Sequence, residues 1–258
     1  MICHGILTFP DVESLSEAAA DEFVRCSRQA VADRGRFMVA LSGGSTPRRL
    51  YQLLAAQPYR SQVDWGRVEF FWGDERCVPP DSPDSNYRMA NEAMLAHLPV
   101  PADHIHRIEA ERSDRDAAAR DYEAVLARAF GVSAGGTPPA LDLVLLGMGP
   151  DGHTASLFPN TQALHETTRW VVANHVPQLN TDRLTLTLPI LNRAREVLFL
   201  VAGADKVERL AEALGPSFAA TPHLPVQLIR PALALKWFVD FAAAGRLLPF
   251  LTRENVQG

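Results

Sequence analysis

The segment GMGPDGHTASLFP, residues 147–159, contains the residues best suited to chemistry, because it places a histidine in a glycine-rich turn. It follows an apolar run and spells G-x-G-x-x-G, the spacing of a dinucleotide-binding turn. Such a turn opens a long helix and is followed about 20 residues later by an acidic residue. Here Pro159 would end a helix within about two turns, and residues 171–174 contain no acid. The sequence therefore argues against a nicotinamide cofactor.

His153 suits the role of a general base. We expect it at the start of a short helix, where the backbone N–H groups disfavour the imidazolium form and keep the ring neutral. Asp151 would either orient the imidazole or cap that helix. A histidine in a turn is more often only a hydrogen-bonded turn residue, so the interpretation depends on the groups that join it.

Three further polar turns follow predicted strands. They are Ser42–Pro47, Gly73–Arg76 and Ala202–Lys206. The carboxyl ends of parallel strands lie along one edge of a sheet, and ligands bind at that edge. These turns and the His153 turn are therefore expected to meet at one crevice.

The SGGSTP turn has the composition of a phosphate cradle. Gly43 and Gly44 allow the backbone to approach a ligand closely, and Pro47 suits the first position of a helix. Hydroxyl groups come from Ser42, Ser45 and Thr46. The turn lacks the P-loop signature, and a well-capped strand-to-helix turn would have a similar sequence.

Lys206 and Arg76 are candidate partners for an anion. Lys206 falls in the first turn of a predicted helix, where a cation is unfavourable unless an anion compensates it. Either residue could equally be a solvated surface charge. Asp74 is expected to orient Arg76 or to contact a hydroxyl, because no nearby ligand completes a metal site. The residues thus indicate a sugar-phosphate site with one histidine base and no metal.

Short apolar runs alternate with amphipathic segments, which predicts a doubly wound α/β fold in a single domain, residues 1–258. Several runs are continuously apolar, as in strands covered on both faces. The expected strands are 37–41, 68–72, 141–146, 170–173, 197–201 and 226–229. The expected helices are 11–35, 47–56, 86–97, 114–130, 204–214 and 233–244. Residues 183–188, RLTLTL, alternate strictly and predict a half-exposed edge strand.

The composition is that of an ordinary globular protein, with 258 residues, 47% hydrophobic and 21% charged. The N-terminus lacks the pattern of a signal peptide, and no apolar run approaches the ~20 residues of a membrane helix. Three widely spaced cysteines argue against disulfides and structural zinc. A net charge of -5 provides no attraction for nucleic acid or anionic membranes. We expect a cytoplasmic monomer or weak homodimer without nucleic-acid or membrane partners.

Six motifs resemble those of the 6-phosphogluconolactonases, in the same order, from about residue 40 to 240. They are ALSGGSTP, WGDERCVP, DSNYRMANEAML, LDLVLLGMGPDGHTASLFP, RLTLTLPILN and VAGADK. The resemblance implies the fold shared with glucosamine-6-phosphate deaminases and ribose-5-phosphate isomerases. That fold is a modified Rossmann-like three-layer sandwich, a mostly parallel sheet with helices on both faces. It also implies hydrolysis of the δ-lactone of 6-phosphogluconate in the pentose phosphate pathway, without a cofactor.

By position, the resemblance implies that His153 is the catalytic base, and Asp151 is the residue that would orient it. It places Asp74, Arg76 and Lys206 among substrate-site residues and residues 42–46 on the family's glycine-rich turn. Arg183 is implied as a further contact, and either Arg183 or a backbone N–H would stabilise the oxyanion. The chain departs from the family at residues 178–180, where many members have a basic, proline-rich sequence, and at Pro150, where an acid is common.

Two alternative functions fit the same fold. One is a glucosamine-6-phosphate deaminase or isomerase, and the other is a non-catalytic regulator that binds sugar phosphates. In the deaminases the turn after the histidine continues Ala-Phe-Asn-Glu-Pro, which adds a carboxylate for proton transfer between carbons. Here it continues Ala-Ser-Leu-Phe-Pro, residues 155–159, with no acid before Glu166. This difference favours lactone hydrolysis.

Overall fold

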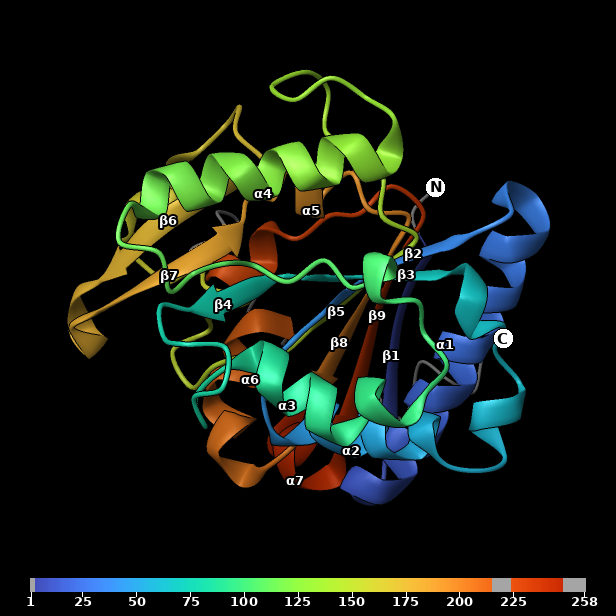
Figure 1. Cartoon of the computed structure of the whole chain (residues 1–258). Helices are drawn as coiled ribbons and strands as arrows, with labels where there is room; N and C mark the ends of the chain where they lie inside the picture. Colours follow the sequence, from blue (N-terminus) through green and yellow to red (C-terminus); the bar gives the residue numbers. More distant parts are fainter. Residues whose placement is uncertain (1–2, 215–223, 248–258) are drawn as a thin grey trace.

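A six-stranded parallel sheet forms the centre of the computed structural model, which describes residues 3–214 and 224–247 (Figure 1). Its strand order is β1-β9-β8-β5-β2-β3, and every neighbouring pair is parallel. The strands are β1 Cys3–Phe9, β2 Phe37–Leu41, β3 Val68–Trp72, β5 Leu143–Leu146, β8 Glu196–Val201 and β9 Ala234–Asp240. The helices are α1 Val12–Arg34, α2 Ser45–Ala55, α3 Asn86–Ala93, α4 Arg115–Phe130, α5 Leu188–Leu191, α6 Val207–Leu214 and α7 Phe241–Ala244.

Strand β3, although it is the last strand of the sheet, shows why the strands are apolar on both faces. The ring of Phe70 lies 6.4 Å from that of Trp65, which packs towards α1 through Phe23. The next residue, Phe71, lies 6.0 Å from Phe130 at the end of α4. Successive side chains of a strand point to opposite faces, so helices cover the sheet on both sides. The predicted three-layer α/β fold is confirmed.

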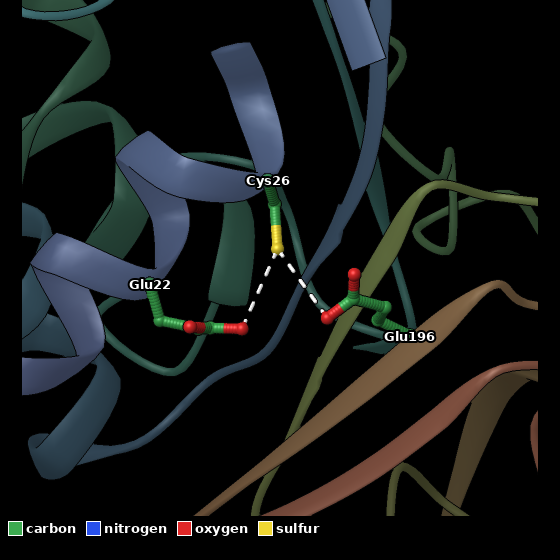
Figure 2. Close-up of side chains that lie close together, drawn as sticks. All are labelled: Glu22, Cys26 and Glu196. Atoms are coloured by element: carbon green, nitrogen blue, oxygen red, sulfur yellow. Dashed lines mark hydrogen bonds between the residues drawn. The ribbon is translucent and has the colours of Figure 1, made fainter. Parts of the chain in front are cut away.

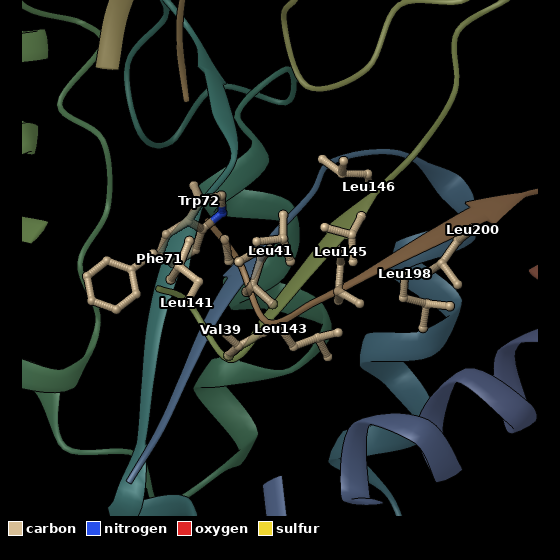
Figure 3. Packing of buried hydrophobic residues seen from close by; sticks show 14 of the residues in the cluster. Val39, Leu41, Phe71, Trp72, Leu141, Leu143, Leu145, Leu146, Leu198 and Leu200 are labelled. Atoms are coloured by element: carbon tan, nitrogen blue, oxygen red, sulfur yellow. The ribbon is translucent and has the colours of Figure 1, made fainter. Parts of the chain in front are cut away.

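The core lies along β2, β5 and β8. Figure 3 shows leucines of β2, β5 and β8 in contact around the centre of the sheet. Val39, Leu41, Leu143 and Leu145 are fully buried. Burial of each such side chain contributes about 1.5–3 kcal/mol. This apolar centre holds the strands rigidly, and with them the turns that follow their carboxyl ends.

A second, three-stranded antiparallel sheet lies beyond the carboxyl end of β3, with order β4-β7-β6. Its strands are β4 Asp74–Arg76, β6 Val171–Val176 and β7 Thr181–Leu186. The prediction that RLTLTL is a half-exposed edge strand was wrong, because β7 pairs with β4 on one side and β6 on the other. Helix α4 also packs on this sheet, so Leu184 and Leu186 are fully buried.

Most predicted elements are confirmed. The strands at 37–41 and 68–72 match to the residue, and the first helix has the predicted N-cap Asp11 and ends at Gly35, whose φ is 77°. The helix expected at 86–97 divides into α3 and a short 3-10 turn at 95–97. The N-terminal strand β1 and the short strand β4 were not predicted. No helix of the described ranges is long and apolar enough to cross a membrane.

Two predicted elements near the C-terminus were wrong. Residues 226–228 belong to a 3-10 helix, Pro225–Leu228, whose C-cap is Ile229, because Pro225 has no N–H for a ladder and Gln227 Oε1 accepts from Leu224 N–H at 3.0 Å. The segment 233–244 is not one helix. Residues 234–240 form β9, which is buried between β1 and β8, and only residues 241–244 are helical. A short apolar run that is buried on all sides fits either pattern.

Strands β2 and β5 form the topological switch point of the sheet. They are neighbours, but the next main-sheet strand after β2 is β3 on one side, whereas the next after β5 is β8 on the other. Ligands of open α/β sheets bind in the crevice outside the carboxyl ends of such strands. The turns at 42–46 and 147–158 leave β2 and β5 at this crevice.

One cluster of potential metal ligands, Glu22, Cys26 and Glu196, ties α1 to β8 on the described part of the chain (Figure 2). Arg25 Nη2 lies 2.7 Å from Glu22 and 2.5 Å from Glu196, and Lys236 pairs with both carboxylates. Burial and the two carboxylates raise the pKa of the Cys26 thiol, so the thiol stays protonated. The cluster is a neutral ion network rather than a metal site.

Glu22→Gln tests this network through acid stability. Burial opposes ionisation of Glu22, but hydrogen bonds from Arg25 and Lys236 outweigh it and lower the pKa of Glu22 from 4.5 to about 2. A depressed folded pKa stabilises the protein above pH 4.5, and this contribution is lost as the pH falls from 4.5 towards 2. We expect the variant to lose about 1–2 kcal/mol of unfolding free energy at pH 7, since water screens part of the attraction.

The measurement is denaturant unfolding of wild type and variant at pH 7 and pH 3, where the difference should shrink. Glu92→Gln is the matched control, because Glu92 forms an exposed pair with Arg88 and should contribute only about 0.3–0.5 kcal/mol. Equal free energies for wild type and Glu22→Gln at pH 7 would contradict the role of the network.

Candidate active site

A cleft of about 320 Å³ opens at the switch point. All four predicted turns contribute to it, so the expectation that they meet at one crevice is confirmed. The predicted residues that line it are Ser42, Gly43, Gly44, Asp74, Arg76, His153, Arg183 and Lys206. Ser45 and Thr46 do not line the cleft, because α2 already begins at Ser45 and carries their side chains away from its floor.

His153 lies in an irregular turn, so the expectation that it starts a short helix was wrong. The ring is oriented by Asp151, whose Oδ1 lies 2.6 Å from His153 Nδ1. Partial burial opposes ionisation of Asp151, but the hydrogen bonds from His153 outweigh it and hold the pKa of Asp151 below its usual value. An ionised carboxylate can only accept, so Nδ1 carries the hydrogen of this contact, and in the neutral imidazole the lone pair is then on Nε2.

The glycines of the turn make room for this ring. A Cβ on Gly149 would lie 2.0 Å from His153 Nδ1. The Gly149 N–H also donates to the His153 carbonyl at 2.9 Å. Gly152 has φ 82°, a conformation that favours glycine. Gly149 therefore makes room for the imidazole, and Gly152 supplies the backbone conformation of the turn, so these two glycines have structural roles without a nucleotide.

The SGG turn, residues 42–44, also packs closely against its neighbours. Gly44, with φ 111°, is the N-cap of α2, and Pro47 is the third residue of that helix rather than the first. A Cβ on Gly43 would lie 1.8 Å from Asn86 Oδ1, so only glycine fits there. Ser42 is anchored by Tyr51, whose hydroxyl donates to the Ser42 carbonyl at 2.9 Å. The N–H groups of the first residues of α2, Ser45 and Thr46, have no intrahelical acceptor and follow directly on this turn.

Arg76 and Arg183 stand directly opposite each other on β4 and β7. Burial and the charge of Arg76 lower the pKa of Arg183. Arg76 donates to the Asp84 carbonyl at 2.6 Å and Arg183 to Thr181 Oγ1 at 3.1 Å. No carboxylate of the described residues forms an ion pair with either arginine. Directly opposed like charges destabilise a sheet, so the pair leaves a site for an anion.

Lys206 reaches the same cleft from the other side. It is the last residue of a 3-10 turn, Ala204–Lys206, and α6 begins only at the next residue. Its Nζ lies 2.8 Å from Asp205 Oδ2, so a carboxylate of the chain itself already compensates part of its charge. Lys206 still lines the cleft.

Asp74 does not orient Arg76 in this structure. It is buried and accepts a hydrogen bond from Ser156 Oγ at 2.6 Å, which is a hydroxyl contact with the protein itself. Asn86 Nδ2 donates to the Asp74 carbonyl at 3.0 Å. Both Ser156 and Asn86 line the cleft, and sequence reasoning did not single out either. Their motifs were visible, but contacts between distant segments leave no local signal.

Glu75 positions Asp74 and Asn86 through hydrogen bonds to the backbone of β4 and α3. Its carboxylate accepts from the backbone N–H groups of Arg76, Asn86 and Tyr87, each at 2.8 Å. Burial raises the pKa of Glu75, although these hydrogen bonds oppose the shift. The side chain thereby fastens the N-terminus of α3 to β4 and holds Asn86 at the cleft.

The family model described as "Glucosamine-6-phosphate isomerases/6-phosphogluconolactonase" matches residues 10–237. The chain belongs to this family. It is 46% identical over 222 residues to a 6-phosphogluconolactonase of Synechocystis, covering 86% of this chain and 89% of the relative. It is 42% identical over 238 residues to one from Nostoc, covering 92% and 96% respectively.

Solved structures agree with this family. The 6-phosphogluconolactonase from Trypanosoma cruzi superposes with a TM-score of 0.83 at 31% identity, covering 96% of this chain and 98% of that one. A monomeric glucosamine-6-phosphate deaminase also superposes, with a TM-score of 0.78 at 18% identity. That second likeness concerns the fold alone, so the side chains of the cleft must separate the two activities.

Proposed function

We propose that this chain hydrolyses the 1,5-lactone of 6-phosphogluconate, a step of the pentose phosphate pathway, with His153 as general base. The relatives named above support the reaction. The observation that carries the mechanism is the distance of 2.6 Å between His153 Nδ1 and Asp151 Oδ1. His153 lines a cleft in which Arg76 and Arg183 stand opposite each other, with no ion pair to a described carboxylate. Neither feature requires a cofactor or a metal ion.

The reaction needs one proton to be moved twice. His153 Nε2 takes a proton from water while the water oxygen bonds to the lactone carbonyl carbon. The tetrahedral intermediate then breaks its bond to the ring oxygen, and the imidazolium returns the proton to that oxygen as it leaves. The product is the open-chain carboxylic acid, which ionises. Such general-base assistance contributes about 10²- to 10⁴-fold.

The phosphate is proposed to bind between the SGG turn and the opposed arginines. Hydrogen bonds from a guanidinium to a phosphate are charge-assisted and among the strongest in proteins. A dianion between Arg76 and Arg183 would also relieve their mutual repulsion. Lys206 and the first N–H groups of α2 would contribute from the other side. Asp74 and Asn86 are left for the sugar hydroxyls.

A deaminase is disfavoured by the residues that follow the base. Moving a proton between two carbons needs a further acid or base, whereas hydrolysis of an activated ester needs one base and water. Among the described residues that line the cleft, Asp74 is the only carboxylic acid, and its carboxylate already accepts a hydrogen bond from Ser156 Oγ. We place the protein in the cytoplasm as a monomer or weak homodimer, with the lactone as its partner.

The direct test is a comparison of two assays on purified protein. We expect faster acid release from freshly generated 6-phosphogluconolactone than the spontaneous rate, and no ammonia from glucosamine 6-phosphate. Ammonia release without lactone hydrolysis would overturn the proposal. Binding of 6-phosphogluconate without any turnover of the lactone would favour the non-catalytic regulator instead.

His153→Ala is expected to lower kcat by at least about 10²-fold with a smaller change in KM, because a base acts mainly in the transition state. Asp151→Ala should have a weaker effect, since water can replace an orienting carboxylate. The matched control is His175→Ala, because His175 also pairs with an aspartate, Asp182, at 2.8 Å on an exposed surface. Near-normal turnover in His153→Ala would remove His153 from the mechanism.

Arg76→Ala and Arg183→Ala are each expected to weaken 6-phosphogluconate binding by about 1.5–3 kcal/mol, the scale of a hydrogen bond to a charged group. Lys206→Ala should cost less, since Asp205 already shares the ammonium group. Isothermal calorimetry measures these affinities. Arg67→Ala, which removes an exposed pair with Asp64 and a hydrogen bond to the Gly35 carbonyl away from the cleft, is the control. Unchanged affinity in both arginine variants would refute the phosphate assignment.

A further inference from the structure

The phenyl ring of Phe158 lies nearly flat against the imidazole of His153. The ring centroids are 3.9 Å apart and the planes are inclined by 23°. Phe158 is only 4% exposed, yet it lies outside the hydrophobic cluster of the described residues, which includes its neighbour Leu157. A ring that is buried without joining the core has a local partner, and the imidazole is the ring on which it stacks.

A tight turn brings Phe158 back onto His153. Thr154 and Leu157 form a β-bridge, with the Leu157 N–H donating to the Thr154 carbonyl at 2.9 Å. Ala155 within this turn has φ 47°, a left-handed conformation that costs a residue with a Cβ about 1–2 kcal/mol. Ser156 anchors the turn to Asp74. The chain accepts a strained residue here, and the result is the stacked pair.

The Nδ1 edge of the imidazole is also occupied. The Gly149 backbone leaves no space for even a methyl group beside Nδ1, and Asp151 holds Nδ1 by a hydrogen bond. We propose that Phe158 is a positioning residue that fixes the plane of the imidazole, so that Nε2 points into the cleft. The proposal rests on the proposed function, in which His153 is the base.

This role has a specific kinetic consequence. Proton transfer from water requires Nε2 to be aligned with the attacking oxygen, and a displacement of about 1 Å can lower the rate by ~10²-fold. Phe158 lines the same cleft as Arg76, Arg183 and Lys206, but its ring makes no stacking or cation–π contact with them among the described residues. Loss of the stack should therefore lower kcat and leave KM nearly unchanged.

Phe158→Leu removes the flat ring and keeps an apolar side chain. We expect kcat to fall by about 10- to 100-fold, with KM within about 3-fold of wild type. Phe158→Tyr retains the ring and should keep kcat within about 3-fold. The matched control is Phe199→Leu, because Phe199 stacks on Trp237 in the core at the same 3.9 Å. That variant should be less stable and have an unchanged kcat.

A second variant changes the packing at the Nδ1 edge of the imidazole, whereas Phe158 lies against its face. Gly149→Ala should lower kcat in the same way, and it carries the test if Phe158→Leu does not fold. Crystal structures of the variants should show Nδ1 moved out of hydrogen-bond distance from Asp151. Wild-type kcat in Phe158→Leu would overturn the proposal, as would a loss in Phe158→Tyr as large as that in Phe158→Leu.

The two proposals fail in distinguishable ways. Wild-type turnover in His153→Ala would overturn the base assignment, and the positioning role of Phe158 with it. A large loss of turnover in His153→Ala together with full activity in Phe158→Leu would overturn only the positioning role.

Discussion

Two arginines that face each other across β4 and β7, with no described carboxylate between them, set the main constraint on this molecule. Their repulsion acts to separate the strands, so other interactions must hold the small sheet together. Burial of Leu184 and Leu186 supplies part of that stability, and α4 covers the same sheet. The Glu75 carboxylate supplies more by fastening β4 to α3. The positive charges of the two arginines are thereby kept available for a ligand, and the small sheet is less stable as a result.

The two sheets are joined so tightly that the cleft between them has fixed dimensions. Only Gly73 separates β3 of the large sheet from β4 of the small one, and its carbonyl accepts the Leu186 N–H at 2.8 Å. Ser156 adds a second link, because its N–H binds Thr185 while its hydroxyl binds Asp74. His153 therefore lies on a turn of the large sheet, and the two arginines lie on a small sheet that these hydrogen bonds tie to it.

Features that depend on local sequence were predictable. Continuous apolar runs identified the central strands, and glycine-bearing polar turns identified the ends that meet at the cleft. Features decided by tertiary contacts were not. Residues 234–240 read as part of a helix but form a strand, because β1 and β8 provide partners on both sides. Other features of the site depend on contacts with segments distant in sequence or on an irregular turn, as for Asn86, Ser156 and Phe158. The hydrophobic periodicity of the sequence does not predict such contacts.

The wrongly predicted elements near the C-terminus had little effect on the prediction of the site, for a reason that lies in the fold. The wrongly predicted β9 and the 3-10 helix before it carry none of the predicted site residues, whereas β2 and β5, whose turns line the cleft, are continuously apolar and were recognised. A deaminase with 18% identity shares this framework, so the framework does not choose the reaction. The proposed difference lies in the turn after His153. There a carboxylate would supply a second proton carrier, whereas the phenyl ring of Phe158 has no proton to exchange, which fits the proposed hydrolysis with a single base.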